Sequence, residues 1–410
     1  MLHRPSNKIL YIIYMTLYTT GFMFCSGTII QTFMISVGMN DTTVSIYNAV
    51  IQFVQAAMIF AMIFVADRIR KVVKTFAVLV LTISLISISL IICIFFRSDS
   101  DIVKLIIFAS SIITYLIIGI KAAIDSKIFY SIIDMRELGR INGMAVAISG
   151  LISFGVSALY SFAVSKFDYY DVMLGFFIFS VIAIVLSSAI CFSYKVNNEK
   201  EDEDKPLSKK PDLSVFKDRT SRVLALPSLF RGFAAGIIGL ITIVGFSGGI
   251  LDIETATYVT LITQITSFAG NMLFSIFSKK VKSSMFLLIS SIVVGVVLPI
   301  SIINGQLLLF LIGYAIVNLA YVIVNIAVPT LICEIVPYEH IGSFTCVRMM
   351  VFTLGSVIAS LVYKPLSDLI GFLGLFIVAA VMQVLCGVIH YIVAKKSKNL
   401  LDESSETKQE

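Results

Sequence analysis

Long apolar runs alternate with short polar connections along most of this 410-residue sequence. Each run is about 20 residues or longer, the length that an α-helix needs to cross the hydrocarbon core of a bilayer. Segments of about ten alternating residues, which a membrane β-barrel would require, do not occur in the sequence. The predicted fold class is therefore an all-α polytopic membrane protein. We predict twelve transmembrane helices, over residues 9–37, 43–65, 73–96, 103–132, 142–165, 171–194, 223–248, 254–277, 284–303, 307–334, 343–363 and 371–394.

The most polar stretch of the sequence, residues 195–222, separates the sixth apolar run from the seventh. It is too highly charged to bury a core, so we interpret it as a cytoplasmic linker, either a solvated connector or a regulatory contact. The predicted domains are two pseudo-symmetric six-helix bundles, 1–194 and 223–394, and a cytoplasmic tail, 395–410. The first run is too long for the core of a signal peptide, so we expect no cleaved signal.

Composition agrees with this pattern, because 58% of the residues are hydrophobic and only 14% are charged. Soluble domains use about 45–50% apolar and about 25% charged residues. The six cysteines are scattered singly, without the spacing of metal ligands or redox pairs, and are interpreted as packing residues. The net charge of +6 comes from the polar connections and does not indicate a nucleic-acid partner.

Lysine and arginine are concentrated in alternate connections, as the positive-inside rule requires of cytoplasmic loops. The opposite side carries only Arg97, Lys104, Lys166 and Lys364. We therefore expect a multi-pass plasma-membrane protein of a bacterium, with both termini in the cytoplasm, embedded in the lipid bilayer as a monomer.

Two ionisable residues lie inside the fourth predicted helix. A charge at the centre of a membrane helix costs about 2.5–3.5 kcal/mol on insertion scales, so such residues are functional candidates. Lys121 and Asp125 are one turn apart and share a face with Ser111, Thr114 and Ile118. One hypothesis is a structural ion pair. The other is a coupling site, in which Asp125 takes up a proton or Na⁺ while Lys121 releases it or contacts an anionic solute.

A second polar face lies on the tenth predicted helix, where hydrogen-bonding residues recur at spacings of 4, 3 and 4. Such a face indicates either a solute site or hydrogen bonds between helices. Its residues are Tyr314, Asn318, Tyr321 and Asn325.

Arg231 and Arg348 are single guanidiniums inside the seventh and eleventh predicted helices. A guanidinium binds a carboxylate or a phosphate in a planar fork. Arg231 is the candidate for solute binding, whereas Arg348 lies near the cytoplasmic end of its helix and could instead pair with Glu334.

Three connections carry the motifs of a known family. The stretch Val65-Ala66-Asp67-Arg68-Ile69-Arg70-Lys71 resembles the signature Gly-x-Leu-Ala-Asp-Arg-x-Gly-Arg-Lys of the major facilitator superfamily, with Ile63 and Arg70 in place of its two glycines. Arg136-Glu137-Leu138-Gly139-Arg140-Ile141-Asn142-Gly143 is similar to the Arg-Gly-Arg-x-x-Gly turn of the same family. Glu334-Ile335-Val336-Pro337 resembles the Glu-x-x-Pro ending common in its sugar porters.

The resemblance implies a central cavity lined by helices 1, 4, 7 and 10, so that the polar faces of helices 4 and 10 would look at each other across it. It also implies that Asp67 accepts hydrogen bonds at a helix N-terminus, pairs with a cation and stabilises the outward-facing state. The residues that we assign to gating are Asp67, Arg68, Lys71, Arg140, Glu334 and Arg348.

Together these features predict a secondary active transporter, a protein that is not an enzyme and needs no cofactor and no metal. It would import a small polar solute, a sugar, a sugar acid or another organic anion, together with H⁺ or Na⁺ by alternating access. The sequence contains no nucleotide-binding loop, and helix 5 lacks the proline of drug–proton antiporters. A multidrug or metabolite exporter is the alternative, and a transporter-like membrane sensor without flux is an alternative of another class.

Overall fold

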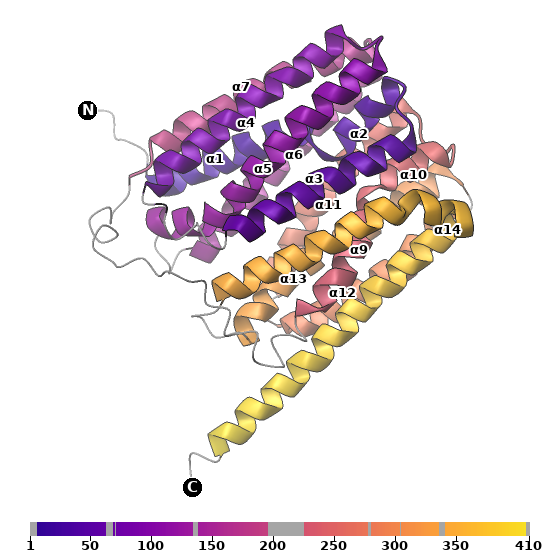
Figure 1. Cartoon of the computed structure of the whole chain (residues 1–410). Helices are drawn as coiled ribbons and strands as arrows, with labels where there is room; N and C mark the ends of the chain where they lie inside the picture. The colour runs from indigo at the N-terminus through magenta and orange to yellow at the C-terminus, as the bar shows by residue number, and fades with distance from the viewer. Residues whose placement is uncertain are drawn as a thin grey trace. The chain divides into compact units, whose positions relative to one another are not determined.

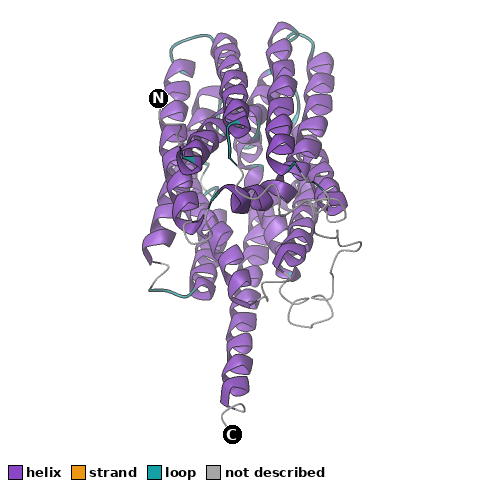
Figure 2. Cartoon of the chain, turned by 90° about the vertical axis from the view of Figure 1, so that its left-hand side faces the viewer, coloured by secondary structure: helices purple, strands orange, loops and turns teal. Residues whose placement is uncertain are grey.

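The computed structural model describes residues 6–62, 69, 71–133, 138–195, 225–277, 280–303, 305–335 and 341–406. Helices joined by turns make up this part of the chain, and it contains no β-strand (Figure 2). A helix satisfies its backbone hydrogen bonds internally, as a segment surrounded by lipid must. The predicted all-α fold is confirmed.

The chain divides into two compact units, and each is described here by itself. Unit 1 comprises Met1–Lys210 with Ile241–Phe268, and unit 2 comprises Pro211–Leu240 with Ala269–Glu410. The bundles 1–194 and 223–394 that the sequence suggests stay a prediction, and most of the predicted linker lies outside the described residues.

In unit 1, α1 packs against α6 and α7, α4 packs against α5 and α7, and α3 packs against α5 (Figure 1). One hydrophobic core joins α4, α5 and α7, with Ile83, Ile124 and Ile184 fully buried in it. The helices of this unit are α1 (Asn7–Phe22), α2 (Gly27–Ser36), α3 (Asp41–Met62), α4 (Val72–Phe95), α5 (Ser100–Ile132), α6 (Leu138–Val164), α7 (Tyr169–Phe192), α10 (Ile241–Ser247) and residues 253–268 of α11 (Ile253–Phe277).

The first predicted helix is interrupted, where the sequence predicted one run over 9–37. Between α1 and α2 a single 3₁₀ turn, Met23–Cys25, is followed by Ser26 in an extended conformation and by Gly27 with φ +60°. Glycine adopts this left-handed conformation without steric cost, so the chain can change direction there. The run carries no charged residue and is apolar enough on average to count as one span, so hydropathy could not reveal the break.

Aspartate side chains cap the N-termini of two helices, at positions outside the apolar runs. Asp168 accepts hydrogen bonds from the backbone N–H groups of Tyr170 and Asp171 at the start of α7. At the start of α11, the N–H of Thr255 donates to Asp252 over 2.8 Å, and the N–H of Asp252 donates to the Thr255 hydroxyl over 2.9 Å. These bonds lower the pKa of Asp252, since they stabilise its ionised form.

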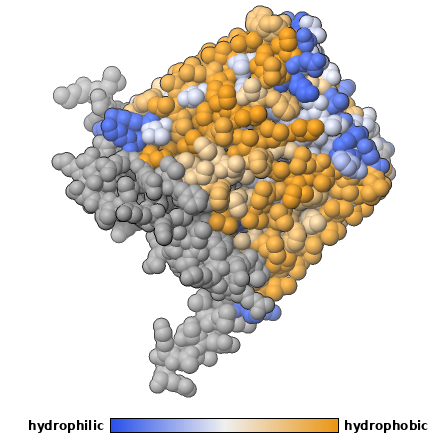
Figure 3. All heavy atoms as spheres, in the orientation of Figure 1, coloured by the Kyte–Doolittle hydropathy of each residue, from blue (hydrophilic) through white to orange (hydrophobic). Residues whose placement is uncertain are grey.

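The outward faces of the helices are apolar, as contact with lipid requires. On α4, Val78, Leu85 and Ile92 are spaced by seven residues and are all exposed, whereas Ala77 and Ser84 on the opposite face are buried. The surface over α4 and α6 is accordingly hydrophobic, and hydrophilic residues gather at helix ends (Figure 3).

In unit 2, α9 packs against α14, and α12 packs against α13 and α14. A core of Val324, Val328, Leu331 and Phe344 joins α13 to α14. The helices of this unit are α9 (Pro227–Gly239), the remainder of α11, α12 (Ser283–Ile300), α13 (Leu307–Ile335) and α14 (Ile341–Glu406).

Nine helices of the described residues are long and apolar enough to cross a membrane, and α9 with α10 counts as a tenth, interrupted at Leu240. The last of the nine, within α14, contains two spans, because Gly371 breaks the helix with φ +70°. With the more polar α11, the described part of the chain holds the twelve predicted transmembrane helices. The final helix runs to Glu406, beyond the predicted end at 394.

Candidate functional site

A cavity of about 300 Å³ lies inside unit 1, beside the ion pair that the sequence predicted. Its wall is formed mainly by α1, α4 and α5, with one residue that follows α7. The residues that line it include Tyr11, Tyr14, Tyr18, Phe76, Lys121, Asp125, Ile128 and Tyr194.

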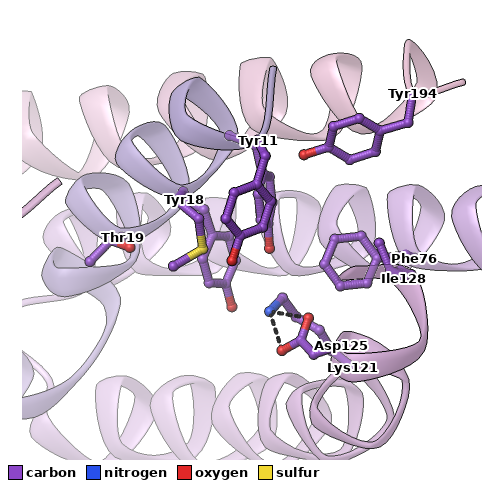
Figure 4. Close-up of a pocket in the computed structure, with 10 residues that line it drawn as sticks. Tyr11, Tyr18, Thr19, Phe76, Lys121, Asp125, Ile128 and Tyr194 are labelled. Carbon is purple, nitrogen blue, oxygen red and sulfur yellow. Dashed lines mark hydrogen bonds and ion pairs between the residues drawn. The ribbon is translucent and has the colours of Figure 1, made fainter. Parts of the chain in front are cut away.

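The ion pair joins two residues one turn apart on α5. Lys121 Nζ donates to both carboxylate oxygens of Asp125, over 3.1 Å to Oδ1 and 3.0 Å to Oδ2 (Figure 4). The Lys121 side chain is only 10% exposed, whereas that of Asp125 is 45% exposed. A proton or a small cation can therefore reach the carboxylate while the ammonium stays buried.

Three aromatic rings also lie near the ammonium. Lys121 Nζ lies 4.7 Å from the ring centroid of Tyr18, 5.0 Å from that of Phe76 and 6.0 Å from that of Tyr14. Rings within about 6 Å attract a cation through their quadrupole, and this attraction increases when water is excluded. We call Tyr14, Tyr18 and Phe76 the aromatic cage. The cage offsets part of the cost of burying Lys121.

The periodicity of α1 places its tyrosines at the cavity. Tyr11, Tyr14 and Tyr18 follow one another at spacings of three and four residues and so share one face of the helix. The rings of Tyr14 and Tyr18 stack at 5.8 Å, and Tyr14 meets Phe76 of α4 edge-on at 5.5 Å. Tyr11 points toward the ion pair in Figure 4.

The cavity also contains unused hydrogen-bonding capacity. The hydroxyl of Tyr14 is buried and has no hydrogen-bond partner among the residues that the structure describes. A buried polar group without a partner is costly, and at a binding site a ligand can supply the missing bond. The site thus combines an accessible carboxylate, a buried ammonium and a free hydroxyl.

Unit 2 brings together three of the residues predicted on its helices. Arg231 of α9 donates a hydrogen bond from Nη2 to the side-chain oxygen of Asn325 on α13. The hydroxyl of Tyr321, one turn before Asn325, is a second hydrogen-bonding partner of Arg231. Tyr314 and Asn318 continue this face and are buried, at 5% and 8% exposed.

The residues assigned to gating are described only in part. Asp67 and Arg68 lie outside the described residues, and so do the side chains of Arg140 and Glu334. Lys71 is exposed and immediately precedes α4. Arg348 of α14 is buried, at 6% exposed. Whether Arg348 pairs with Glu334 therefore stays open.

The sequence matches the family model of the Major Facilitator Superfamily over residues 10–360 and again over residues 251–409. The chain belongs to the major facilitator superfamily. As a member of this superfamily it is a membrane transporter, and the resemblance carried by its sequence motifs is confirmed.

Solved structures share the fold of this superfamily member. A D-xylose–proton symporter is 14% identical, with a TM-score of 0.68, over 94% of this chain and 96% of its own. The superfamily transporter FucP in its outward conformation is 12% identical, with a TM-score of 0.63, over 95% of this chain and 97% of its own. At these identities the likeness shows the fold alone. A search among curated protein sequences gave no significant match.

Sequence reasoning missed the aromatic part of this superfamily member's cavity. Tyr11, Tyr14 and Tyr18 recur at helical spacing, which was a usable signal, but Phe76 is a single aromatic residue near the start of a long apolar run. Aromatic residues in membrane helices face lipid, core or cavity without a difference in spacing. Their role here depends on Lys121, which is about 100 residues away from α1 along the chain.

Proposed function

We propose that this superfamily member is a secondary active transporter that imports a small polar solute, a sugar, a sugar acid or another organic anion, across the plasma membrane by alternating access. H⁺ or Na⁺ is the coupling ion. The observation that carries the proposal is the ion pair of Lys121 and Asp125 at the cavity of unit 1, with the carboxylate half-exposed and the ammonium buried.

Coupling follows from the way in which the ion pair is buried. Protonation of Asp125, or binding of Na⁺ to it, neutralises the carboxylate and leaves Lys121 with only the aromatic cage. A buried charge that loses its partner is destabilised by about 3–5 kcal/mol. An oxygen of the solute can replace the carboxylate at Lys121, so the ion and the solute each favour binding of the other.

The lining of the cavity favours a polar solute over a hydrophobic drug. It contains four tyrosines, but one phenylalanine and one methionine, Phe76 and Met15. A cavity dominated by phenylalanine and methionine would instead favour the exporter.

The test is uptake of radiolabelled D-xylose, D-glucose, D-glucuronate and D-gluconate into proteoliposomes under an imposed inward H⁺ or Na⁺ gradient. We expect Asp125→Asn and Lys121→Gln to lower gradient-driven uptake by more than about tenfold, which corresponds to about 1.4 kcal/mol. Asp101→Asn and Lys104→Gln are matched controls, because both residues are exposed near the start of the same helix.

Three other results would contradict the proposal. Uptake at the wild-type rate in both Asp125→Asn and Lys121→Gln would show that the ion pair is not the coupling site. Efflux driven by an inward gradient would indicate an exporter. No flux of any of these solutes, with correctly inserted protein, would favour a sensor.

A further inference from the structure

Two buried guanidiniums lie close together in unit 2. Arg231 of α9 and Arg348 of α14 are each only 6% exposed. The ring of Phe352 lies 4.9 Å from the Arg231 guanidinium carbon, and Phe352 is one helical turn from Arg348. The two positive charges are near enough to repel each other.

The close packing of α9 against α14 fixes this arrangement. A Cβ added at Gly232 would overlap the carbonyl oxygen of Phe352, and one added at Gly355 would overlap that of Leu229. Arg348, Phe352 and Gly355 are spaced by four and three residues, so they share the face of α14 that meets α9. Arg231, directly before Gly232, therefore enters the same interface.

The guanidiniums are not neutralised by the described part of the chain. Arg231 donates through Nη2 to Asn325, but its Nε and Nη1 are buried without a hydrogen-bond partner, and so is Nε of Arg348. No described carboxylate forms an ion pair with either residue. Buried unpaired cations of this kind are strongly unfavourable unless another group compensates them.

A third side chain of unit 2 also has a buried nitrogen without a partner among the described residues. His390, in the second half of α14, is fully buried and within electrostatic range of both arginines. Its Nδ1 is 2.8 Å from the carbonyl oxygen of Cys386, a contact that makes Nδ1 the protonated nitrogen, while Nε2 has no partner. Within the described residues the cluster offers three guanidinium nitrogens without acceptors, and no carboxylate pairs with it.

We propose that Arg231 and Arg348 form an oxyanion site and that the transported solute carries a carboxylate or phosphate group that binds there. Planar guanidiniums match both groups in charge and geometry. Asn325 and Tyr321 hold Arg231 in place by hydrogen bonds and Phe352 by ring contact, which leaves Nε and Nη1 for the anion. This inference rests on the proposed function, because it names the class of the solute.

The test uses the purified full-length chain in a neutral detergent and measures its thermal unfolding midpoint. Inorganic phosphate and D-gluconate are titrated against NaCl at equal ionic strength. A ligand that binds the folded chain raises the midpoint with concentration. We expect this rise in the wild type, and an apparent Kd weakened about 10- to 100-fold in Arg231→Gln and Arg348→Gln, since hydrogen bonds to a charged group are lost.

Lys364→Gln is the matched control, because Lys364 is a half-exposed cation of the same unit, paired with Asp368. It should respond to both anions as the wild type does. If neither arginine variant folds, arginine modification of the wild type by phenylglyoxal replaces them. Phosphate should then protect Arg231 and Arg348 but leave Arg97 reactive.

Several results would overturn the inference. The first is a wild-type unfolding midpoint that does not change with either anion. The second is an equal rise of the midpoint in the arginine variants and the wild type. The third is that phosphate does not protect Arg231 and Arg348 from phenylglyoxal. A rise with phosphatidylglycerol but not with the soluble anions would assign the site to a lipid headgroup and exclude the solute. The assay requires no flux, so it separates the two proposals. If the anions do not bind but uptake is intact, only the anion site is excluded. If the anions bind but no solute is transported, only the transport proposal is excluded.

Discussion

At the scale of single residues, the chain keeps charge inside apolar helices by two different means. Lys121 has a carboxylate one turn away and aromatic rings near it, whereas Arg231 has the Asn325 amide, the Tyr321 hydroxyl and one ring, and no carboxylate among the described residues. The first arrangement is nearly complete and compensates its own charge. The second leaves nitrogens without partners among the described residues, and it is there that we propose a ligand.

Replacing Tyr18 by Leu should lower the thermal stability of the transporter. The substitution removes the ring nearest to Lys121 Nζ, at 4.7 Å, and cation–π contacts are worth about 0.5–2 kcal/mol, with the upper value for desolvated sites. The measurement is thermal unfolding in detergent at neutral pH. Tyr18→Phe retains the ring and should stay close to the wild type. Equal losses in the two variants would show that the hydroxyl matters and the ring does not.

At the scale of helices, the apolar runs were predictable and their interruptions were not. The thickness of the bilayer sets the length of each run, so twelve spans could be assigned, although the last two predicted helices end earlier than the observed ones. The pairing of Lys121 with Asp125 was also predictable, because helical geometry alone brings them together. The breaks at Ser26 and Leu240 depend on backbone dihedrals that hydropathy does not report.

The glycines of α9 illustrate what the sequence could and could not give at this scale. Gly232, Gly236 and Gly239 recur at spacings of four and three residues, a pattern that permits close approach to another helix or bending, and the structure has such a close approach at Gly232 and Gly236. The spacing did not identify the partner as α14, more than 100 residues later, so it could not bring Phe352 or His390 to Arg231.

Gly232→Ala should destabilise unit 2 by at least about 1–3 kcal/mol, the usual cost of overpacking a tight interface. The added methyl group would overlap the backbone of Phe352, which cannot move aside as a flexible side chain could. Thermal unfolding in detergent measures the effect. Gly239→Ala in the same helix is the control, because a Cβ there meets nothing within 4 Å. Similar unfolding midpoints for both variants would mean that α9 and α14 can move apart without a loss of stability.

At the scale of the whole molecule, superfamily membership gives the architecture, and the charge distribution gives an orientation that the structure does not test. Lysine and arginine gather in alternate connections because cytoplasmic loops retain them. The direction of insertion is thus a prediction from sequence. The solute could not be predicted in the same way, because its identity depends on side chains that converge from distant parts of the chain.

The orientation predicts which connections can be reached from outside the cell. Ser98, between α4 and α5, and Lys280, between α11 and α12, are both exposed and lie on opposite predicted sides. A membrane-impermeant maleimide should label Ser98→Cys but not Lys280→Cys in intact cells, and both after permeabilisation. The wild type gives the background of the native cysteines. The reverse pattern would place both termini outside.

The aromatic cage around Lys121 also has a consequence for selectivity. Its rings and Asp125 together form a receptor for an ammonium ion, and the chain fills it with a side chain of its own. A tethered group competes with an effective concentration in the millimolar range or above, without any cost of association. We therefore expect the cavity to exclude organic cations, because Lys121 already occupies the position that an amine would take.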